Sequence, residues 1–303
     1  MTSTEITLRT PTGVRLAATW QSTARPTAAA APAVVLCQGL SGTRSLVLPQ
    51  VAARLAEAGV GSLRFDYAGF GHSSGERGWI DPRARSDDAL LALAWLRQAD
   101  GVAPHRVGLY GHSFGGPVAI HTAARDLHVP AVVAVSGPGD GREMLRAARP
   151  EWDWLAFLDR VEAERASVAA GSAPTVVPVS DILPFSPEFE RRYTELKAST
   201  GGTSAGASGS GLGVDHFYLA SADAILDFMP VASATRLTRT NLLMINGAAD
   251  DTASIDTVDA VYAAAPGVKR WIVLPSADHN ALDVDPLLSH AATLAADWFV
   301  EHL

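Results

Sequence analysis

Strand-like segments open the chain and flank a turn signal. Residues 5–10 (EITLRT) and 14–20 (VRLAATW) lie on either side of Pro-Thr-Gly at 11–13. Proline and glycine between two strand-like runs favour a tight turn, so we expect a β-hairpin. Residues 33–38 (AVVLCQ) then form a continuous apolar run. Such a run is typical of a strand that is buried on both faces of a parallel sheet.

After this first buried strand, apolar runs of strand length alternate with segments of helical spacing. The expected strands are 33–38, 60–66, 106–111, 131–137, 240–247 and 269–275, and the expected helices are 49–59, 83–98, 115–126, 254–265 and 286–303. Strands that alternate with helices in this way form parallel βαβ units. The pattern therefore predicts an α/β fold with a mostly parallel, doubly wound sheet.

The alternation is interrupted between residues 138 and 236. This stretch shows helical segments, at 151–165, 187–198 and 216–228, and no buried-strand pattern. Residues 199–213 (STGGTSAGASGSGLG) are rich in glycine and serine, so we expect a flexible segment, either a surface loop or a mobile lid. The expected organisation is a core of residues 1–137 and 237–303 with a helical cap inserted at 138–236.

Composition narrows the class of protein. The 303 residues are 48% hydrophobic and 18% charged, which supports a large core and argues against disorder. The net charge of −8 and the lack of a basic patch argue against nucleic acid as a partner. Cys37 is the single cysteine, and no histidine pair has ligand spacing, so we expect no disulfide, metal or cofactor. Without a signal-like N-terminus or an apolar run of roughly 18 residues, we expect a cytoplasmic protein with no membrane partner.

The candidate nucleophile is Ser113, which lies between an expected strand and an expected helix. It is the centre of Gly111-His112-Ser113-Phe114-Gly115, a G-x-S-x-G pattern. A nucleophile on a sharp strand-to-helix turn has a strained backbone, and side chains two residues before and after it would clash. The alternative is an inert polar turn residue. The context favours the nucleophile.

A serine hydroxyl needs a base, and in this type of architecture the acid and then the histidine follow the serine along the chain. His279 lies on a short loop after the last expected strand, where a base can reach the serine. Asp250 follows the preceding strand and is the expected acid, which would orient the imidazole. Asp251 and Asp140 remain alternatives for the acid.

An oxyanion hole and an acyl pocket complete the predicted site. The backbone N–H groups of Leu40, after the buried strand 33–38, and of Phe114 are the expected oxyanion donors. Aromatic residues of the cap are candidates for an apolar acyl pocket: Trp152, Trp154, Phe157, Phe217 and Tyr218. The alternative is that these side chains pack the cap against the core.

Four motifs, in this order, resemble those of the α/β-hydrolases. They are RFDYAGFGHSSG (64–75), GHSFGG (111–116), INGAADD (245–251) and PSADHN (275–280). In the first motif the resemblance implies structural roles for Asp66, Gly69, Gly71 and Ser73. Residues 217–237 are similar to a subgroup allied to dienelactone hydrolases and S15-type peptidases. Many relatives carry His-Gly where this chain has Gln38-Gly39, so the side-chain contacts of the oxyanion loop are expected to differ.

The resemblance implies an α/β-hydrolase fold and acyl transfer to water through an acyl-enzyme on Ser113. The expected substrate is a small-molecule ester or thioester, free or carrier-bound, with a hydrophobic acyl group. A peptidase or amidase, and an acyltransferase or cyclase that uses the same triad, are alternatives. A binding module without catalysis is a further alternative from a different class.

Overall fold

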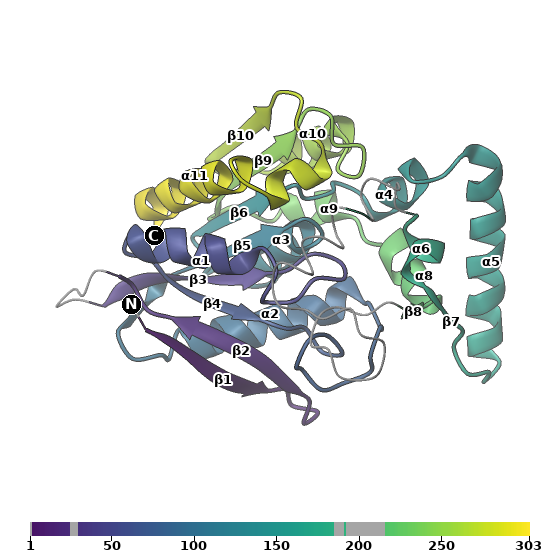
Figure 1. Cartoon of the computed structure of the whole chain (residues 1–303), viewed down its shortest axis with the longest axis horizontal. Helices are drawn as coiled ribbons and strands as arrows, with labels where there is room; N and C mark the ends of the chain where they lie inside the picture. The colour runs from purple at the N-terminus through teal and green to yellow at the C-terminus, as the bar shows by residue number, and fades with distance from the viewer. Residues whose placement is uncertain (1, 25–29, 185–190, 192–215) are drawn as a thin grey trace.

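The computed structural model describes residues 2–24, 30–184, 191 and 216–303 (Figure 1). An eight-stranded sheet with the order β1-β2-β4-β3-β5-β6-β9-β10 forms its centre. The strands are β1 (Ser3–Arg9), β2 (Arg15–Gln21), β3 (Ala31–Cys37), β4 (Gly61–Phe65), β5 (Val102–His112), β6 (Ala131–Val135), β9 (Asn241–Gly247) and β10 (Lys269–Leu274). Pairing is antiparallel at β1–β2 and β2–β4 and parallel from β4 onward. The predicted N-terminal hairpin and mostly parallel sheet are confirmed.

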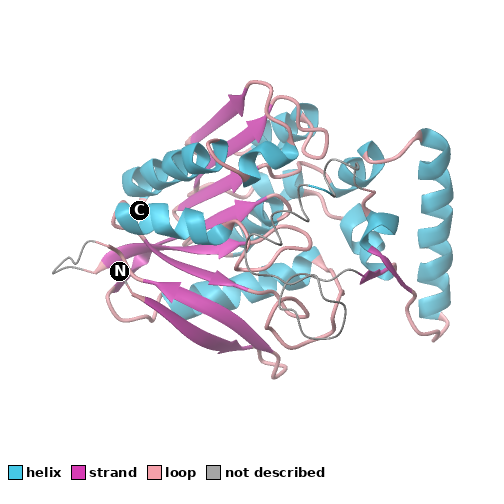
Figure 2. Cartoon of the chain, viewed as in Figure 1, coloured by secondary structure: helices cyan, strands magenta, loops and turns pink. Residues whose placement is uncertain are grey.

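Helices cover both faces of this sheet, as Figure 2 shows. The main helices are α1 (Leu48–Glu57), α2 (Pro82–Leu96), α3 (Gly115–Arg125), α10 (Ile255–Ala264) and α11 (Leu287–His302). Alternate residues of β3 face opposite sides, because successive side chains of a strand point in opposite directions. Val34 and Leu36 share a buried cluster with α1 and α11, whereas Val35 and Cys37 share the other cluster with α2 and α3. The continuous apolar run of β3 is therefore explained by burial on two faces.

Strand β5 is longer than its apolar pattern predicts. It begins at Val102, which pairs with Ala31 before a register shift in the ladder between β3 and β5. Residues 104–106 are exposed or half-buried, so the apolar pattern of the sequence does not include this extension. It indicates only the buried part of the strand that follows. The buried part of β5 ends at His112, directly before the candidate nucleophile Ser113.

The segment between β6 and β9 contains helices and a small second sheet. Its elements are α4 (Gly141–Ala147), α5 (Glu151–Ala169), β7 (Val176–Pro178), α6 (Val179–Ile182), β8 (His216–Tyr218), α8 (Ala220–Leu226) and α9 (Pro230–Ala234). The pairing of β7 with β8 corrects the expectation of helices alone, because Val177 and Phe217 face each other as a buried cross-strand pair. The helix expected at 187–198 and the flexible segment expected at 199–213 lie outside the described residues, apart from residue 191.

Helix α5 lies at the edge of the molecule, with α6 and α8 between it and the main sheet (Figure 1). Within the described ranges, no helix combines the length and the apolar character that a membrane span requires.

Candidate active site

Ser113 occupies a strained turn between β5 and α3. Its φ is 50°, a backbone conformation that non-glycine residues rarely adopt. A Cβ on Gly111 would lie 2.1 Å from the carbonyl oxygen of Gly115, and one on Gly115 would lie 2.3 Å from that of Cys37. Both positions therefore require glycine. The Ser113 N–H donates to the Val135 carbonyl at 2.7 Å, which fixes the turn to β6.

The structure brings Ser113, His279 and Asp250 together in one hydrogen-bonded chain. Ser113 Oγ lies 2.9 Å from His279 Nε2. His279 Nδ1 lies 2.9 and 3.0 Å from the two carboxylate oxygens of Asp250. The three residues follow β5, β10 and β9, and the carboxyl ends of parallel strands meet at one edge of a sheet. This is an arrangement in which an imidazole can accept a serine proton.

Asp250 is held by the turn that follows it. Its Oδ1 accepts hydrogen bonds from the N–H groups of Thr252 at 3.0 Å and Ala253 at 2.7 Å. The neighbouring carboxylate, Asp251, is exposed and accepts a long hydrogen bond of 3.5 Å from the Thr252 hydroxyl. Asp140, the other alternative acid, caps α4 by accepting from the Glu143 N–H at 3.0 Å. Of the three aspartates, Asp250 is the one in contact with the imidazole.

The surroundings of His279 favour its protonated form. Burial by itself lowers the pKa of the imidazole, but the charge and hydrogen bond of Asp250 act in the opposite direction. Asp283 and Asp251 add to this effect, and the pKa of His279 is raised above its ordinary value of 6.5. An imidazolium that forms when His279 takes a proton is therefore stabilised in place.

The loop after β3 passes directly beside Ser113. A Cβ on Gly39 would lie 3.3 Å from Ser113 Cβ and 3.6 Å from its Oγ. The Gln38 side chain ties this loop together: its Oε1 accepts from the Gly39 N–H at 2.8 Å, and its Nε2 donates to the Thr43 carbonyl at 2.6 Å. The Gln38 amide thus supplies the side-chain contacts that hold this loop.

The two predicted oxyanion donors both border the cavity over Ser113. Leu40 lies in the loop after β3, and Phe114 immediately precedes α3. Neither backbone N–H has a hydrogen-bond acceptor among the described parts of the chain. Both amides are therefore available for a developing oxyanion.

The cavity over Ser113 has a volume of about 220 Å³. One part of its wall is apolar and comprises Leu40, Leu46, Val47, Met144, Ala147, Ala148 and Leu183. Another part, beside His279, carries the polar residues Asp251, Thr252, Asp278, Asn280 and Asp283. The cavity thus offers both apolar and polar side chains to a substrate at the candidate nucleophile.

None of the five aromatic residues expected to form the acyl pocket lines this cavity. Trp152 is 75% exposed, and Trp154 stacks on Phe157 with ring centroids 6.0 Å apart. Phe217 packs against Phe70, and Tyr218 packs against Trp79 and donates to the Glu76 carboxylate. These side chains pack the inserted segment or face solvent, because α5 presents its buried face to α8 rather than to the cavity. Residues of α4 and Leu183 line the cavity in place of these aromatic side chains.

A second histidine–aspartate contact joins the nucleophile turn to the histidine loop. His112 Nε2 lies 2.5 Å from Asp283 Oδ1, at the end of the 3-10 helix η1 (His279–Asp283). Neither side chain was predicted from the sequence to take part in the site. The contact joins residues 171 positions apart, so no local sequence pattern indicates it.

Comparison with known proteins places this geometry in context. A family model described as alpha/beta hydrolase fold matches residues 32–286. An uncharacterized 31.7 kDa protein from the traX–finO intergenic region of Escherichia coli is 25% identical over 279 residues, covering 90% of this chain and 91% of its own. The quorum-quenching protein AidA of Acinetobacter baumannii is 34% identical over 158 residues, 52% of each chain. The thiohydrolase aneE of Aspergillus aculeatus is 33% identical over 105 residues, covering 34% of this chain and 33% of its own.

Among solved structures, the alpha/beta hydrolase GrgF from Penicillium superposes with a TM-score of 0.79. Its sequence is 19% identical in that superposition, which covers 100% of this chain and 99% of the other, so the likeness shows the fold. A Penicillium protein of the same name, described as a polyketide transferase, is 29% identical over 154 residues, half of each chain. The relatives thus include one named as a thiohydrolase and one named as a polyketide transferase.

Proposed function

This chain belongs to the α/β-hydrolase fold family, and from that membership we propose that it is a serine hydrolase that cleaves a carboxylic ester or thioester. The observation that carries the proposal is the hydrogen-bonded chain from Ser113 Oγ through His279 to Asp250. Nucleophile, base and orienting acid within hydrogen-bond distance are what nucleophilic acyl transfer requires.

The proposed reaction begins with attack of Ser113 Oγ on the substrate carbonyl carbon. His279 Nε2 accepts the Oγ proton, and the carbonyl π electrons move to the oxygen, which the N–H groups of Leu40 and Phe114 stabilise. The tetrahedral intermediate then collapses. The bond from carbon to the leaving alcohol or thiol breaks, the leaving group takes the proton from His279, and the acyl group stays on Ser113.

Water completes the cycle. His279 removes a proton from the water molecule as its oxygen attacks the acyl carbon, and a second oxyanion forms in the same position. Collapse breaks the bond to Ser113 Oγ, which regains a proton from His279, and the carboxylic acid is released. Asp250 keeps Nδ1 of the imidazole protonated throughout, so that Nε2 is the atom that exchanges protons.

Acyl transfer to an alcohol or amine, or ring closure, is the second candidate. The relative described as a polyketide transferase favours it. The same acyl-enzyme would form, and the acceptor in the second half-reaction would differ. Mass spectrometry of the products, with acyl thioester as donor and a panel of alcohols and amines in water, separates the two: free acid supports hydrolysis, and ester or amide products support transfer.

Fluorophosphonate labelling tests the proposal directly. We expect the folded protein to form one covalent adduct, on Ser113, and to hydrolyse p-nitrophenyl esters. The control Ser113→Ala should take no label and lose at least about 10³-fold in kcat while it stays folded. Failure of the folded wild type to take the label or to cleave any ester or thioester of a panel would overturn the hydrolase and favour a binding module. Faster cleavage of p-nitroanilides than of matching esters would favour an amidase.

A further inference from the structure

An arginine is buried behind the loop that carries the proposed oxyanion donor. Arg85, in the first turn of α2, is 3% exposed. Its Nη1 donates to the Gly39 carbonyl at 3.2 Å, and its Nη2 donates to the Leu40 carbonyl at 2.6 Å. One side chain from a different element therefore holds two consecutive carbonyls of the loop after β3.

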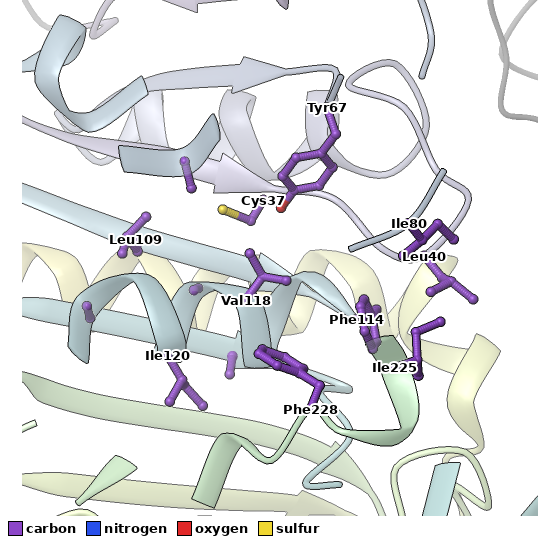
Figure 3. Packing of buried hydrophobic residues seen from close by; sticks show 14 of the residues in the cluster. Cys37, Leu40, Tyr67, Ile80, Leu109, Phe114, Val118, Ile120, Ile225 and Phe228 are labelled. Atoms are coloured by element: carbon purple, nitrogen blue, oxygen red, sulfur yellow. The ribbon is translucent and has the colours of Figure 1, made fainter. Parts of the chain in front are cut away.

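Aromatic rings hold this guanidinium in place. Its carbon lies 4.7 Å from the ring centroid of Tyr67 and 4.6 Å from that of Phe70, distances at which a cation is attracted to a ring face. Figure 3 shows the Tyr67 ring directed at Cys37, the last residue of β3 before the loop. Burial lowers the pKa of Arg85 to about 10, so the group remains charged at neutral pH. The guanidinium of Arg85 is thus a fixed, charged hydrogen-bond donor with two N–H groups directed at the loop.

The contact with the Gly39 carbonyl also determines where the next amide points. The Gly39 C=O and the Leu40 N–H belong to one planar peptide, and in a trans peptide they point in opposite directions. Since Arg85 holds the carbonyl on the core side, the Leu40 N–H is directed to the other side, where Gly39 adjoins Ser113. The peptides on either side are held as well: the Gly39 N–H, in the preceding peptide, donates to Gln38, and the Leu40 carbonyl, in the following peptide, accepts from Arg85.

We propose that Arg85 is a positioning residue that orients and polarises the Gly39–Leu40 peptide, so that the Leu40 N–H is a preset donor for the oxyanion. This inference rests on the proposed serine hydrolase function. A hydrogen bond to the carbonyl end of a peptide strengthens the N–H of that peptide as a donor. A donor that is already oriented needs no rearrangement when charge develops on the substrate oxygen.

The buried charge itself supports this role. Replacement of buried charged groups by apolar residues of similar volume is often neutral or stabilising, so packing alone gives no reason to bury an arginine here. A positive group near the oxyanion in a low-dielectric interior has a stronger effect than it would have in water. The effect would act on the transition state, because the substrate carbonyl carries no full charge.

Arg85→Met tests the proposal, with ester hydrolysis and the affinity of a trifluoromethyl ketone as readouts. Such a ketone forms an oxyanion adduct with a serine, so its binding reports on the oxyanion hole. We expect kcat per active site, titrated with fluorophosphonate, to fall about 10- to 100-fold, below the full loss of an oxyanion donor. KM should stay within about two-fold. The ketone should bind more weakly by the same factor as kcat falls.

Arg149→Met is the matched control. Arg149 is 9% exposed, donates to the carbonyls of Leu145 at 2.9 Å and Asp181 at 2.5 Å, and packs on the Phe157 ring at 3.8 Å. Like Arg85 it is buried, binds two carbonyls and packs on an aromatic ring; it also pairs with Asp153 at 3.4 Å, and it does not contact the oxyanion loop. Its loss should lower Tm without changing the ratio of ketone affinity to substrate KM.

Arg85→Lys keeps the charge and most of the volume but loses the two-pronged fork. It should recover part of the lost kcat, and it decides the question if Arg85→Met does not fold. Folded Arg85 variants with wild-type kcat per titrated site and wild-type ketone affinity would overturn the positioning role. A wild type that neither takes the fluorophosphonate nor cleaves esters would instead overturn the proposed function, so the two failures are distinguishable.

Discussion

At the residue scale, Asp250 has two tasks in the same turn. It accepts hydrogen bonds from two backbone N–H groups and contacts Nδ1 of His279. Asp250→Asn retains an oxygen for the backbone but removes the charge, and an amide N–H can turn the imidazole to the wrong tautomer. We expect kcat for ester hydrolysis to fall about 10³- to 10⁴-fold, with little change in the urea midpoint.

Asp251→Asn is the control for this prediction, because Asp251 is the adjacent carboxylate and is exposed. Asp251 also lines the cavity and raises the pKa of His279, so the comparison is made at a pH well above that pKa, where kcat should stay within about three-fold of the wild type. A large loss in Asp251→Asn together with an active Asp250→Asn would reassign the acid. Steady-state kinetics of both variants on one ester settles this.

The raised pKa of His279 sets the pH dependence. His279 accepts a proton only when it is neutral, so activity is lost as the pH falls through its pKa. Because burial is outweighed by Asp250 and Asp283, the acid limb of kcat/KM should have its midpoint above pH 6.5. Asp283→Asn should move that midpoint to lower pH, and a midpoint that rises or does not move would contradict the contribution of Asp283. The profile of kcat/KM between pH 5 and 9 measures both.

Sequence alone predicted the residues that a local signal marks. Ser113 stands in a glycine-flanked turn, and Asp250 and His279 follow recognisable buried strands. The contacts of Arg85 with Gly39 and of His112 with Asp283 carry no such signal, because they join positions 46 and 171 residues apart through side chains. The turn explains which residue is placed at the site, and packing across elements explains what holds it there.

At the element scale, the quality of the prediction followed burial. The central strands β3, β4, β6 and β9 are almost wholly buried, so their apolar runs were plain in the sequence. The inserted segment was harder, because β8 has three residues and leads directly into the start of α8 at Ala220. The sequence predicted a helix at 151–165 but not which neighbour its apolar side chains would contact. Placement of Trp154 and Phe157 at the cavity was the consequence.

The turn between β5 and α3 gives a prediction at this scale. A Cβ at Gly111 would be 2.1 Å from a backbone oxygen, and backbone cannot move away as a side chain can. Gly111→Ala should therefore separate the strand from the helix and destabilise the fold by about 3 kcal/mol or more. Urea denaturation of Gly111→Ala and of a control, Gly101→Ala, measures this.

Gly101 has a positive φ of 79° but open space around its Cα, so the control should lose only about 1 kcal/mol. Equal stability of the two variants would contradict the steric account of the G-x-S-x-G glycines. Loss of fluorophosphonate labelling in Gly111→Ala under conditions where it is still folded would show that the turn also sets the nucleophile.

At the scale of the whole molecule, the cavity joins two parts of the chain. The core supplies Ser113, His279 and the oxyanion loop, whereas Met144 and Leu183 come from the inserted segment. The chemistry we propose thus depends on the strand ends of the sheet, and the shape of the apolar wall depends on the insertion. Acyl selectivity and catalytic rate should therefore respond to different sets of substitutions.

This division predicts how the rate depends on acyl length. Each methylene buried in the apolar part of the cavity contributes about 0.8 kcal/mol, or about four-fold in kcat/KM. For p-nitrophenyl esters we expect kcat/KM to rise from acetyl through the longer straight-chain acyl groups until the cavity of about 220 Å³ is filled. Equal kcat/KM for acetyl and for longer esters would contradict an apolar acyl site.

Met144→Trp tests whether the insertion sets that limit. The larger side chain fills part of the cavity, so the longest accepted acyl group should become shorter while kcat/KM for the acetyl ester stays within about three-fold. Trp152→Ala is the control, because Trp152 is 75% exposed and does not line the cavity. It should leave the whole chain-length profile unchanged. A shifted profile in Trp152→Ala, with an unshifted one in Met144→Trp, would return the acyl site to the aromatic residues that the sequence first indicated.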